Sequence, residues 1–597
     1  MLKQFRFVFL ACAVLSVVFL AVGGCKSIKE IFERNKDSEL DKKFEVPLLE
    51  TEDGKPKLVG DCAAINNYST VAVHGFGLVV GLPGTGGDDL QSVPYQEVYN
   101  DMNRRGISNI RTILASPETA VVAIVGYMHP GIQKGDRFDV DVMLPPDTNT
   151  KSLRGGRLLE APLTERLGAQ ESSSYAAAAG PIMVEDPTAT EASNPSGLKK
   201  GTILGGAIAA KPRALSLIMT EDSQFIAVTN QIAKEINKRF PMPSGVQKGV
   251  ATAYSDVLIV LEIHPSYAND IPRYVRVIQS IACYETPAKQ IRRIERLKEE
   301  LLVPATSQHA AFQLEALGKA GIVPLQQALR SPDMEVRFHA ATSLAYLGDS
   351  TPAKVLTEAA RVEPAFRVYA LNALSVMKND LEAETHLREL LHVPSAETRY
   401  GAFRALKYRN PRDQTIRGEI LGGQFSYHGI NSSTVPMVHI TTKKQPEVVL
   451  FGTDIFLRQP FAFDAGPFIY VNGQAQGEVV VSKFVKSGVD EERRVSNRLD
   501  AVIRAVADLG GTYPDVVQLL RQADAQGVLS CRLAINCLPE AERTYRRNGS
   551  DSELAEEEEE EKPKSFWSRL NPRNIFSPNP GEKSSDYMGT VNTSVRD

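Results

Sequence analysis

A chain of 597 residues has room for several domains, because a domain averages about 150 residues. Lys and Arg (68) nearly balance Asp and Glu (72), so the formal net charge of -4 gives no general case for nucleic-acid binding. The hydrophobic content of 43% is ordinary for a globular protein.

The N-terminus has the form of a secretory signal. Lys3 and Arg6 supply positive charge, and an apolar stretch follows from residue 7 to residue 22. That stretch is short for a membrane-spanning helix, which needs about 20 apolar residues. Gly23-Gly24-Cys25 comes next and resembles the lipobox of bacterial lipoproteins. The resemblance implies that residues 1–24 are a lipoprotein-type signal peptide and that Cys25 becomes the acylated first residue.

Two alternatives remain open for this region, an ordinary signal peptide and an uncleaved anchor. Lys26 follows the cysteine where an aspartate would suggest retention in the inner membrane, so the resemblance favours the outer membrane. A lipid anchor of two or three chains would hold the protein stably. Residues 25–57 are charged and polar and are interpreted as a tether.

Four further cysteines remain in the mature chain, Cys62, Cys283, Cys531 and Cys537. An exported compartment permits disulfides, but the pairing cannot be deduced from the sequence. No CxxC pair occurs, so structural zinc is not expected.

Residues 58–286 alternate β-rich runs with two helical patterns and are predicted to form a β-rich body. The predicted strands are 78–80, 119–127, 138–144, 213–217 and 257–263, and the predicted helices are 94–105 and 225–240. Residues 169–197 are rich in Ala, Ser, Thr and Pro without a sustained period, so a loop is predicted there.

The most unusual part of this body is VHGFGLVVGLPGTGGD, residues 73–88. It holds six glycines: Gly75, Gly77, Gly81, Gly84, Gly86 and Gly87. Gly81 and Gly86 have the spacing of a phosphate-binding loop, but Gly87 and Asp88 stand where that loop needs Lys and Ser or Thr. Nucleotide binding is therefore not expected. The glycines are interpreted as allowing a neighbouring backbone to approach closely.

A second stretch, KSLRGGRLLEAPL at residues 151–163, is predicted to belong with the first. Its motif consists of Ser152, Leu153, Arg154, Gly155 and Gly156. Arg154 is either a surface arginine at a turn or a contact to another subunit or to the cell wall. In the second interpretation, the two glycines let the partner approach.

Three strings in this body resemble, in the same order, the bacterial flagellar P-ring protein family. They are GFGLVVGLPGTGG at 75–87, TAVVAIVGYMHPGIQKGDRFDV at 119–140 and SLRGG at 152–156. Residues 499–536 resemble the closing segment of the same family, with helix, Gly, Pro-Asp, helix, Ala-Gly and strand. The resemblance implies a ring-forming body, with the glycine-rich motifs as assembly motifs.

Residues 287–411 carry a different pattern. A short sequence motif recurs three times, with Arg337, Arg367 and Arg399 in equivalent places. The arginines are 30 and 32 residues apart, and an Ala- and Leu-rich helix follows each. This period is typical of helical-pair solenoids, and the block resembles HEAT-like repeats. It is interpreted as a surface, marked by the three arginines, for a protein partner of unknown identity. The alternative is a helical spacer with no partner.

Residues 412–539 are predicted to form a second P-ring-like body. Its predicted strands are 435–441, 447–451, 468–471, 478–485 and 529–535, and its predicted helices are 499–509 and 513–525. Residues 540–597 are predicted to be an acidic, disordered tail, with six consecutive glutamates at 556–561. A peripheral contact with membrane or cell wall is the alternative for residues 562–576.

The predicted fold is α+β, with β-rich ring-forming domains interrupted by an α-helical HEAT-like solenoid. The resemblance implies a structural subunit of the periplasmic flagellar P ring, a homo-oligomer that surrounds the rod at the peptidoglycan layer as a bushing for rotation. The implied partners are other copies of the chain, the rod, the outer-membrane ring proteins, peptidoglycan and, through Cys25, the outer membrane. No catalytic residue, cofactor, metal or nucleic-acid partner is expected.

Two other hypotheses are kept. One is an envelope lipoprotein that uses the P-ring-like body and the helical repeats as a protein-binding scaffold unrelated to motility. The other is an enzyme such as a wall hydrolase, for which no catalytic arrangement is legible around Cys62 or the paired carboxylates Asp139 and Asp141.

Overall fold

A computed structural model describes residues 55–87, 92–146, 148–165, 174–190, 192–242, 249–474, 477–484, 489–541 and 543–547. The predictions for Cys25, the signal peptide, the glutamate run and residues 562–576 lie outside the described residues. Compaction begins as predicted near Leu58, which pairs with Ala282 in an isolated bridge.

The first body is built on a sheet of seven strands in the order β4-β3-β2-β5-β6-β8-β7. The strands are β2 (Val71–Val80), β3 (Thr119–Met128), β4 (Arg137–Met143), β5 (Arg157–Leu163), β6 (Ala176–Pro181), β7 (Met183–Val184) and β8 (Lys200–Ala209). Because β4 also pairs with β8, six of these strands form a closed sheet. Its interior is filled by inward-facing Val, Ile, Leu and Ala side chains.

Short helices lie on and beside this closed sheet. α5 (Val93–Arg104) and α6 (Ile110–Leu114) cover the outer face of β2 and β3 through a small apolar cluster that includes Leu78, Val98 and Leu114. Pro94 and the Ser92 cap start α5, as the pattern at 94–105 predicts. α7 (Pro195–Leu198) precedes β8.

The second sheet of the first body has the order β1-β9-β11-β10. It consists of β1 (Ala63–Asn66), β9 (Leu215–Met219), β11 (Leu258–Leu261) and β10 (Ala251–Ala253), and it packs with α4 (Val59–Cys62), α8 (Ile226–Arg239) and α9 (Ile271–Gln279). The predicted helix at 225–240 is confirmed as α8. Its buried apolar residues, Val228, Ile232, Ala233 and Ile236, recur at helical spacing.

Eight α-helices follow in the described part of the chain between residues 287 and 409. They are α10 (Pro287–Leu301), α11 (Pro304–Ala316), α12 (Ile322–Ala328), α13 (Met334–Tyr346), α14 (Ala353–Val362), α15 (Pro364–Val376), α16 (Leu381–Leu390) and α17 (Ala396–Arg409). α11, α13, α15 and α17 pack each on the next, and α12, α14 and α16 pack beside them. This helical block has the stacking expected of a solenoid, and its classification as HEAT-like stays a prediction.

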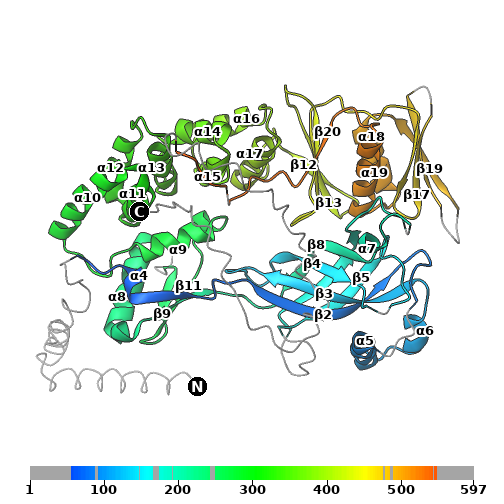
Figure 1. Ribbon diagram of the computed structural model, residues 1–597, viewed down its shortest axis with the longest axis horizontal. Helices are drawn as coiled ribbons and strands as arrows, with labels where there is room; N and C mark the ends of the chain where they lie inside the picture. Colours follow the sequence, from blue (N-terminus) through cyan, green and yellow to red (C-terminus); the bar gives the residue numbers. More distant parts are fainter. Residues whose placement is uncertain are drawn as a thin grey trace, which may run out of the picture.

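The C-terminal body has two sheets with two helices between them (Figure 1). One sheet has the order β12-β13-β15-β14-β20 and the other β16-β17-β18-β19. Their bounds are β12 (Gly418–Leu421), β13 (Phe425–Ile430), β14 (Met437–Ile440), β15 (Glu447–Phe451), β16 (Phe461–Ala465), β17 (Ile469–Gly473), β18 (Glu478–Lys483), β19 (Glu491–Ser496) and β20 (Arg532–Ile535). The helices are α18 (Leu499–Asp508) and α19 (Tyr513–Ala525), as predicted from their spacing.

A buried polar network joins the helical block to the first body. Arg273 of α9 forms an ion pair with Glu315 of α11, and both side chains are almost wholly buried. Tyr267 donates to the same carboxylate at 2.7 Å, and the Arg273 guanidinium also donates to Ser343 of α13 at 3.0 Å. We refer to these four residues as the Arg273 network.

A second buried network joins the helical block to the C-terminal body. Glu447 of β15 is fully buried and accepts hydrogen bonds from Lys407 and Tyr400 of α17 and from Ser426 of β13. Burial alone would raise the pKa of Glu447, but the cationic Lys407 and Arg404 hold it below its ordinary value. We refer to Glu447, Lys407, Tyr400 and Ser426 as the Glu447 network.

The prediction of a loop over residues 169–197 is wrong for its central part. Ala176–Pro181 forms β6, which pairs with β5 and β8 inside the closed sheet. Alanine is a weak strand former, but the neighbouring strands supply the pairing that local propensity does not. Within the described residues, no helix combines the length and apolar character needed to cross a bilayer.

Candidate functional site

The two glycine-marked stretches lie side by side. β2 pairs with β5 at Val79–Leu158 and Val80–Arg157. Beyond the strands, the Thr85 hydroxyl donates to the Ser152 carbonyl at 2.8 Å, and the Lys151 amide donates to the Thr85 carbonyl at 2.9 Å. The two motifs therefore form one structural unit, which we call the glycine joint (residues 75–87 and 151–156).

Close packing explains two of the glycines. A Cβ added at Gly75 would lie 2.5 Å from the Pro162 carbonyl oxygen, and one added at Gly86 would lie 2.1 Å from the Thr119 carbonyl oxygen. Both obstacles are backbone atoms, so a rotamer change cannot relieve them. Gly81, Gly84 and Gly87 have positive φ angles, which suit the turn that follows β2.

Replacing Gly86 by alanine is expected to destabilise the glycine joint by about 1–3 kcal/mol, because the backbone near Thr119 must move. The effect should appear as faster hydrogen exchange of amides in β2 and β3. The matched control is Gly429→Ala, where an added Cβ meets nothing within 4 Å and φ is not positive. Equal exchange rates in the two variants would contradict this account.

Three backbone amides of the loop after β2 are already paired within the chain. The amides of Leu82, Gly86 and Gly87 donate to the carbonyls of Glu118, Pro117 and Thr119 at 2.8–3.0 Å. A phosphate-binding loop needs such amides unpaired and pointing at the anion. The geometry agrees with the missing Lys and Ser or Thr, and it assigns the loop a packing role.

The Arg154 side chain makes its hydrogen bonds to backbone groups of its own chain. Its guanidinium donates to the carbonyls of Pro187 and Ala189 at 2.8 Å and 2.6 Å, and burial lowers its pKa. Ser152 is buried, and its hydroxyl accepts from the Arg154 amide at 3.1 Å. Arg154 therefore fixes the segment after β7, and its guanidinium bonds are made within the subunit.

Gly155 brings the C-terminal body onto the glycine joint. It has φ +76°, and a Cβ there would lie 2.6 Å from a side-chain carbon of Pro467. Leu153 is fully buried, and Gly156 packs on Val79 and Leu82. The partner that approaches these glycines in the structure is thus another part of the same chain.

The three repeat arginines are also engaged within the chain. Arg367 and Arg399 are buried, whereas Arg337 is half-buried. Arg337 donates to the carbonyls of Ser331 and Pro332. Arg367 donates to the Ala360 carbonyl and to the Glu397 carboxylate. Arg399 donates to the carbonyls of Pro394 and Val435. These bonds fix the helix starts and, through Val435, the C-terminal body. The role of the arginines as a partner surface remains a prediction.

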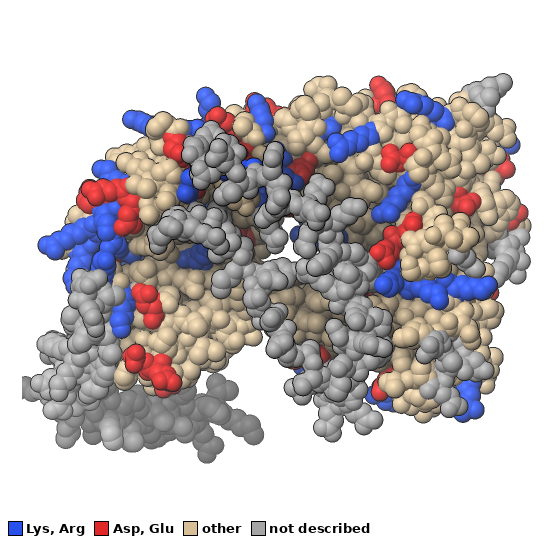
Figure 2. Space-filling view, viewed as in Figure 1, with Lys and Arg blue, Asp and Glu red and all other residues tan. Residues whose placement is uncertain are grey.

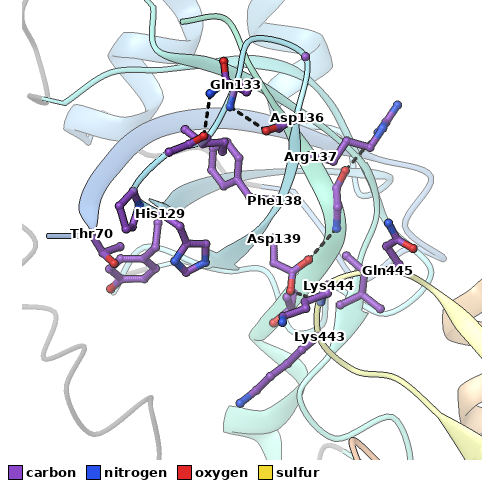
Figure 3. A pocket seen from close by; sticks show the side chains of 18 of the residues that line it. Thr70, His129, Gln133, Asp136, Arg137, Phe138, Asp139, Lys443, Lys444 and Gln445 are labelled. Atoms are coloured by element: carbon purple, nitrogen blue, oxygen red, sulfur yellow. Dashed lines mark hydrogen bonds between the residues drawn. The ribbon is translucent and has the colours of Figure 1, made fainter. Parts of the chain in front are cut away.

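Sequence reasoning missed a second contact between the two β-rich bodies. Asp139 of β4 accepts from the Gly205 amide at 2.7 Å and from the Lys444 amide of the β14–β15 loop. Figure 3 shows Asp139 beside Lys443 and Lys444 at the wall of an open cavity of about 2350 Å³. Nothing local in the sequence links residues 139 and 444, which are 305 positions apart.

Asp141 lines the same cavity, on the same strand face as Asp139, as the alternation predicts. Burial raises the pKa of Asp141 to about 6, while a hydrogen bond from Thr202 opposes the shift. Among the described residues, no group of His, Cys, Asp or Glu is arranged to hold a metal ion. Figure 2 shows both signs of charge interspersed over the visible face, without a dominant one.

Asp141→Asn should make the protein more stable at neutral pH. The pKa of Asp141 is higher in the folded chain than in the unfolded chain. As pH increases, Asp141 therefore loses its proton first in the unfolded chain, which favours unfolding. The free energy of unfolding of the wild type thus falls between about pH 4 and pH 6. One pKa unit corresponds to about 1.4 kcal/mol, so the variant should gain about 1–3 kcal/mol at pH 7 and nothing at pH 3.5. Urea unfolding at both pH values measures this gain. An equal gain in Asp256→Asn, a variant at an exposed position, would contradict this account.

The four cysteines in the described part of the chain are free thiols. The sulfur atoms of Cys62 and Cys283 lie 3.5 Å apart, and both residues are buried. Hydrogen bonding from Cys283 lowers the pKa of Cys62 to about 7. No general base is hydrogen-bonded to either sulfur among the described residues, so the pair does not resemble a nucleophilic site.

A family model described as "Flagellar P-ring protein" matches residues 58–294, a range that contains the whole glycine joint and ends inside α10. Residues 58–294 of the chain are therefore similar to the flagellar P-ring protein family. Members of the P-ring family are structural components of the basal body and not enzymes.

Individual relatives agree with the P-ring assignment. The flagellar P-ring protein of Geotalea uraniireducens is 26% identical over 345 residues, which cover 54% of this chain and 88% of that protein. That of Geobacter sulfurreducens is 26% identical over 248 residues, covering 39% of this chain and 63% of that protein. Flagellar P-ring protein 1 of Hahella chejuensis is 35% identical over 124 residues, covering 21% of this chain and 32% of that protein. The chain thus spans less than two thirds of the length of two of these relatives.

Proposed function

We propose that this chain is a structural subunit of the flagellar P ring that assembles around the rod at the peptidoglycan layer as a bushing for rotation. The observation that carries the proposal is the family match over residues 58–294, which includes both motifs of the glycine joint. The proposed partners are further copies of the chain, the rod, the outer-membrane ring proteins and peptidoglycan. The periplasm is the proposed compartment, with an outer-membrane anchor at Cys25.

The glycine joint supports this function from within the subunit. β2 lies between β3 and β5 in a closed sheet, so it has no free edge for pairing with a neighbour. The joint instead orients the first body against the C-terminal body at Pro467. Contacts between copies are therefore proposed for other surfaces. The sheet edges at β1 and β12 are suitable, whereas the charged side chains of β19 disfavour pairing there.

Electron microscopy of the mature protein purified from envelopes tests the proposal. A P-ring subunit should give closed rings, because a heterologous contact that repeats by rotation closes on itself. The same rings should appear in isolated basal bodies. Dispersed particles at every concentration, together with motile deletion cells that keep intact basal bodies, would contradict the proposal and favour the scaffold hypothesis.

A further inference from the structure

The chain does not leave the folded structure at residue 540. After β20, Pro539 packs against Gly401 of α17, and the Tyr369 hydroxyl of α15 donates to the Ala541 carbonyl at 2.7 Å. Figure 1 shows this segment running from the C-terminal body across the helical block toward α13. The predicted start of the disordered tail is therefore too early. We call residues 543–547, Arg-Thr-Tyr-Arg-Arg, the strap.

Burial alternates along the strap. Arg543, Tyr545 and Arg547 are half-buried, whereas Thr544 and Arg546 are exposed. In an extended chain, residues two apart point to the same side and lie about 6.5 Å from each other. The strap thus presents an Arg-x-Tyr-x-Arg face to the helices.

Each of these three side chains meets a specific group on the helical block. Arg543 donates two hydrogen bonds to the Glu397 carboxylate, at 2.8 Å and 2.6 Å. Arg547 donates two to the Glu335 carboxylate, at 2.6 Å and 3.0 Å. Two-pronged bonds of this kind fix geometry as well as charge. The hydrogen bonds from Arg543 make the largest contribution to lowering the pKa of Glu397.

The central tyrosine completes an aromatic stack. The ring of Tyr545 lies 4.5 Å from that of Phe366, centroid to centroid, and Phe366 lies 4.0 Å from Phe338 with the rings nearly parallel. Phe338 and Phe366 are buried, so Tyr545 covers an apolar surface that would otherwise face water.

The three receiving groups lie near the starts of three successive stacked helices. Glu335, Phe366 and Glu397 stand in the first turns of α13, α15 and α17, and each is 31 residues from the next. Stacked helices lie about 8–10 Å apart, a step that long arginine side chains can match from an extended peptide. Glutamates at helix N-termini are favoured by the helix dipole. Arg367 also binds Glu397 at 2.7 Å, so this repeat arginine positions the carboxylate for the strap.

We propose that the first turns of α13, α15 and α17 form a binding site for an extended peptide of the pattern Arg-x-aromatic-x-Arg, and that residues 543–547 are its occupant. The acidic pair and the stacked phenylalanines select the ligand by charge and by ring spacing. The site is a recognition surface of the repeats that is distinct from the glycine joint. It does not depend on the proposed ring function.

A peptide titration in trans tests the proposal. The probe is a fluorescently labelled peptide of residues 539–549, and the protein is the full mature chain carrying Arg543→Ala, Tyr545→Ala and Arg547→Ala. We expect fluorescence anisotropy to show binding to this variant at least about 10-fold tighter than to the wild type, whose site is filled. Adding Glu335→Lys and Glu397→Lys to the variant should abolish binding.

Matched peptides separate recognition from general charge attraction. A peptide with alanine in place of Thr544 and Arg546 should bind within about 2-fold, because both side chains face solvent. A second peptide, which carries Arg543→Ala and Arg547→Ala, should not bind. Equal affinity of these two peptides, or equal binding to wild type and triple variant, would overturn the proposal.

A second measurement applies if the triple variant does not fold. In the otherwise wild-type chain, Glu397→Gln should increase hydrogen exchange of residues 543–547 by at least about 10-fold, and Arg546→Ala should leave it unchanged. Unchanged exchange in Glu397→Gln would equally overturn the proposal.

Discussion

Replacing Glu315 by alanine is expected to lower the free energy of opening the contact between α9 and α11 by about 3–5 kcal/mol. The change leaves Arg273 buried and charged without its carboxylate, and it also removes the acceptor of the Tyr267 hydroxyl. Hydrogen exchange of amides in α9 and α11 should accelerate roughly 10²- to 10⁴-fold. Local exchange is the right measurement, because a chain with several bodies does not unfold in one two-state step.

Two further variants show whether the unpaired charge of Arg273 causes the destabilisation. Glu295→Ala, at an exposed position of α10, should change exchange by less than about 2-fold. The double variant Arg273→Met with Glu315→Leu removes both charges and should be less destabilised than the single change. If the double variant is as unstable as Glu315→Ala, lost packing rather than an unpaired charge is responsible.

Replacing Glu447 by alanine is expected to detach α17 from the C-terminal sheet, again at about 3–5 kcal/mol. Lys407, Tyr400 and Ser426 would all lose their shared acceptor. Because the folded-state pKa of Glu447 is lowered, its contribution is present above its ordinary pKa of 4.5 and is lost as pH falls below it. The difference between wild type and variant should therefore be full at pH 7 and shrink below about pH 4.5.

Hydrogen exchange of α17 and β15 measures this effect. The matched control is Glu491→Ala, at an exposed position of edge strand β19, which should leave both elements unchanged. Glu447→Gln keeps an acceptor for Tyr400 but not the charge that Lys407 needs, so it should fall between the alanine variant and the wild type. An effect of Glu447→Ala that is independent of pH would argue against the ion pair.

The sequence predicted elements best where a single period dominated. The helices at 94–105, 225–240, 499–509 and 513–525 are confirmed as α5, α8, α18 and α19 within one or two residues. Strands were found where β-branched residues cluster, as in β3 and β15. β19 was missed because its sequence, EERRVS, carries charges that suit an exposed edge but hide the strand pattern.

The candidate site was predicted only in part, for a physical reason. The glycines pointed correctly to close backbone approach, and the two motifs do meet through Thr85 and Ser152. What approaches Gly155 is Pro467, more than 300 positions later in the chain. Likewise, the repeat arginines were predicted to mark a surface for a partner protein. Arg367 and Arg399 are instead buried, and they bond to Glu397 and Val435, which no local sequence pattern indicates. Long-range pairing of this kind is set by the tertiary fold.

The Gly155–Pro467 contact and the two buried networks together determine how force passes between the first body and the C-terminal body. At this contact the first body touches the C-terminal body directly. The two bodies are also linked indirectly through helices α10 to α17. The Arg273 network joins these helices to the first body, and the Glu447 network joins them to the C-terminal body. A force that shears the two bodies is therefore shared by two parallel routes. Because both routes connect the same two bodies, this closed circuit would resist torsion between them even when either route is weakened.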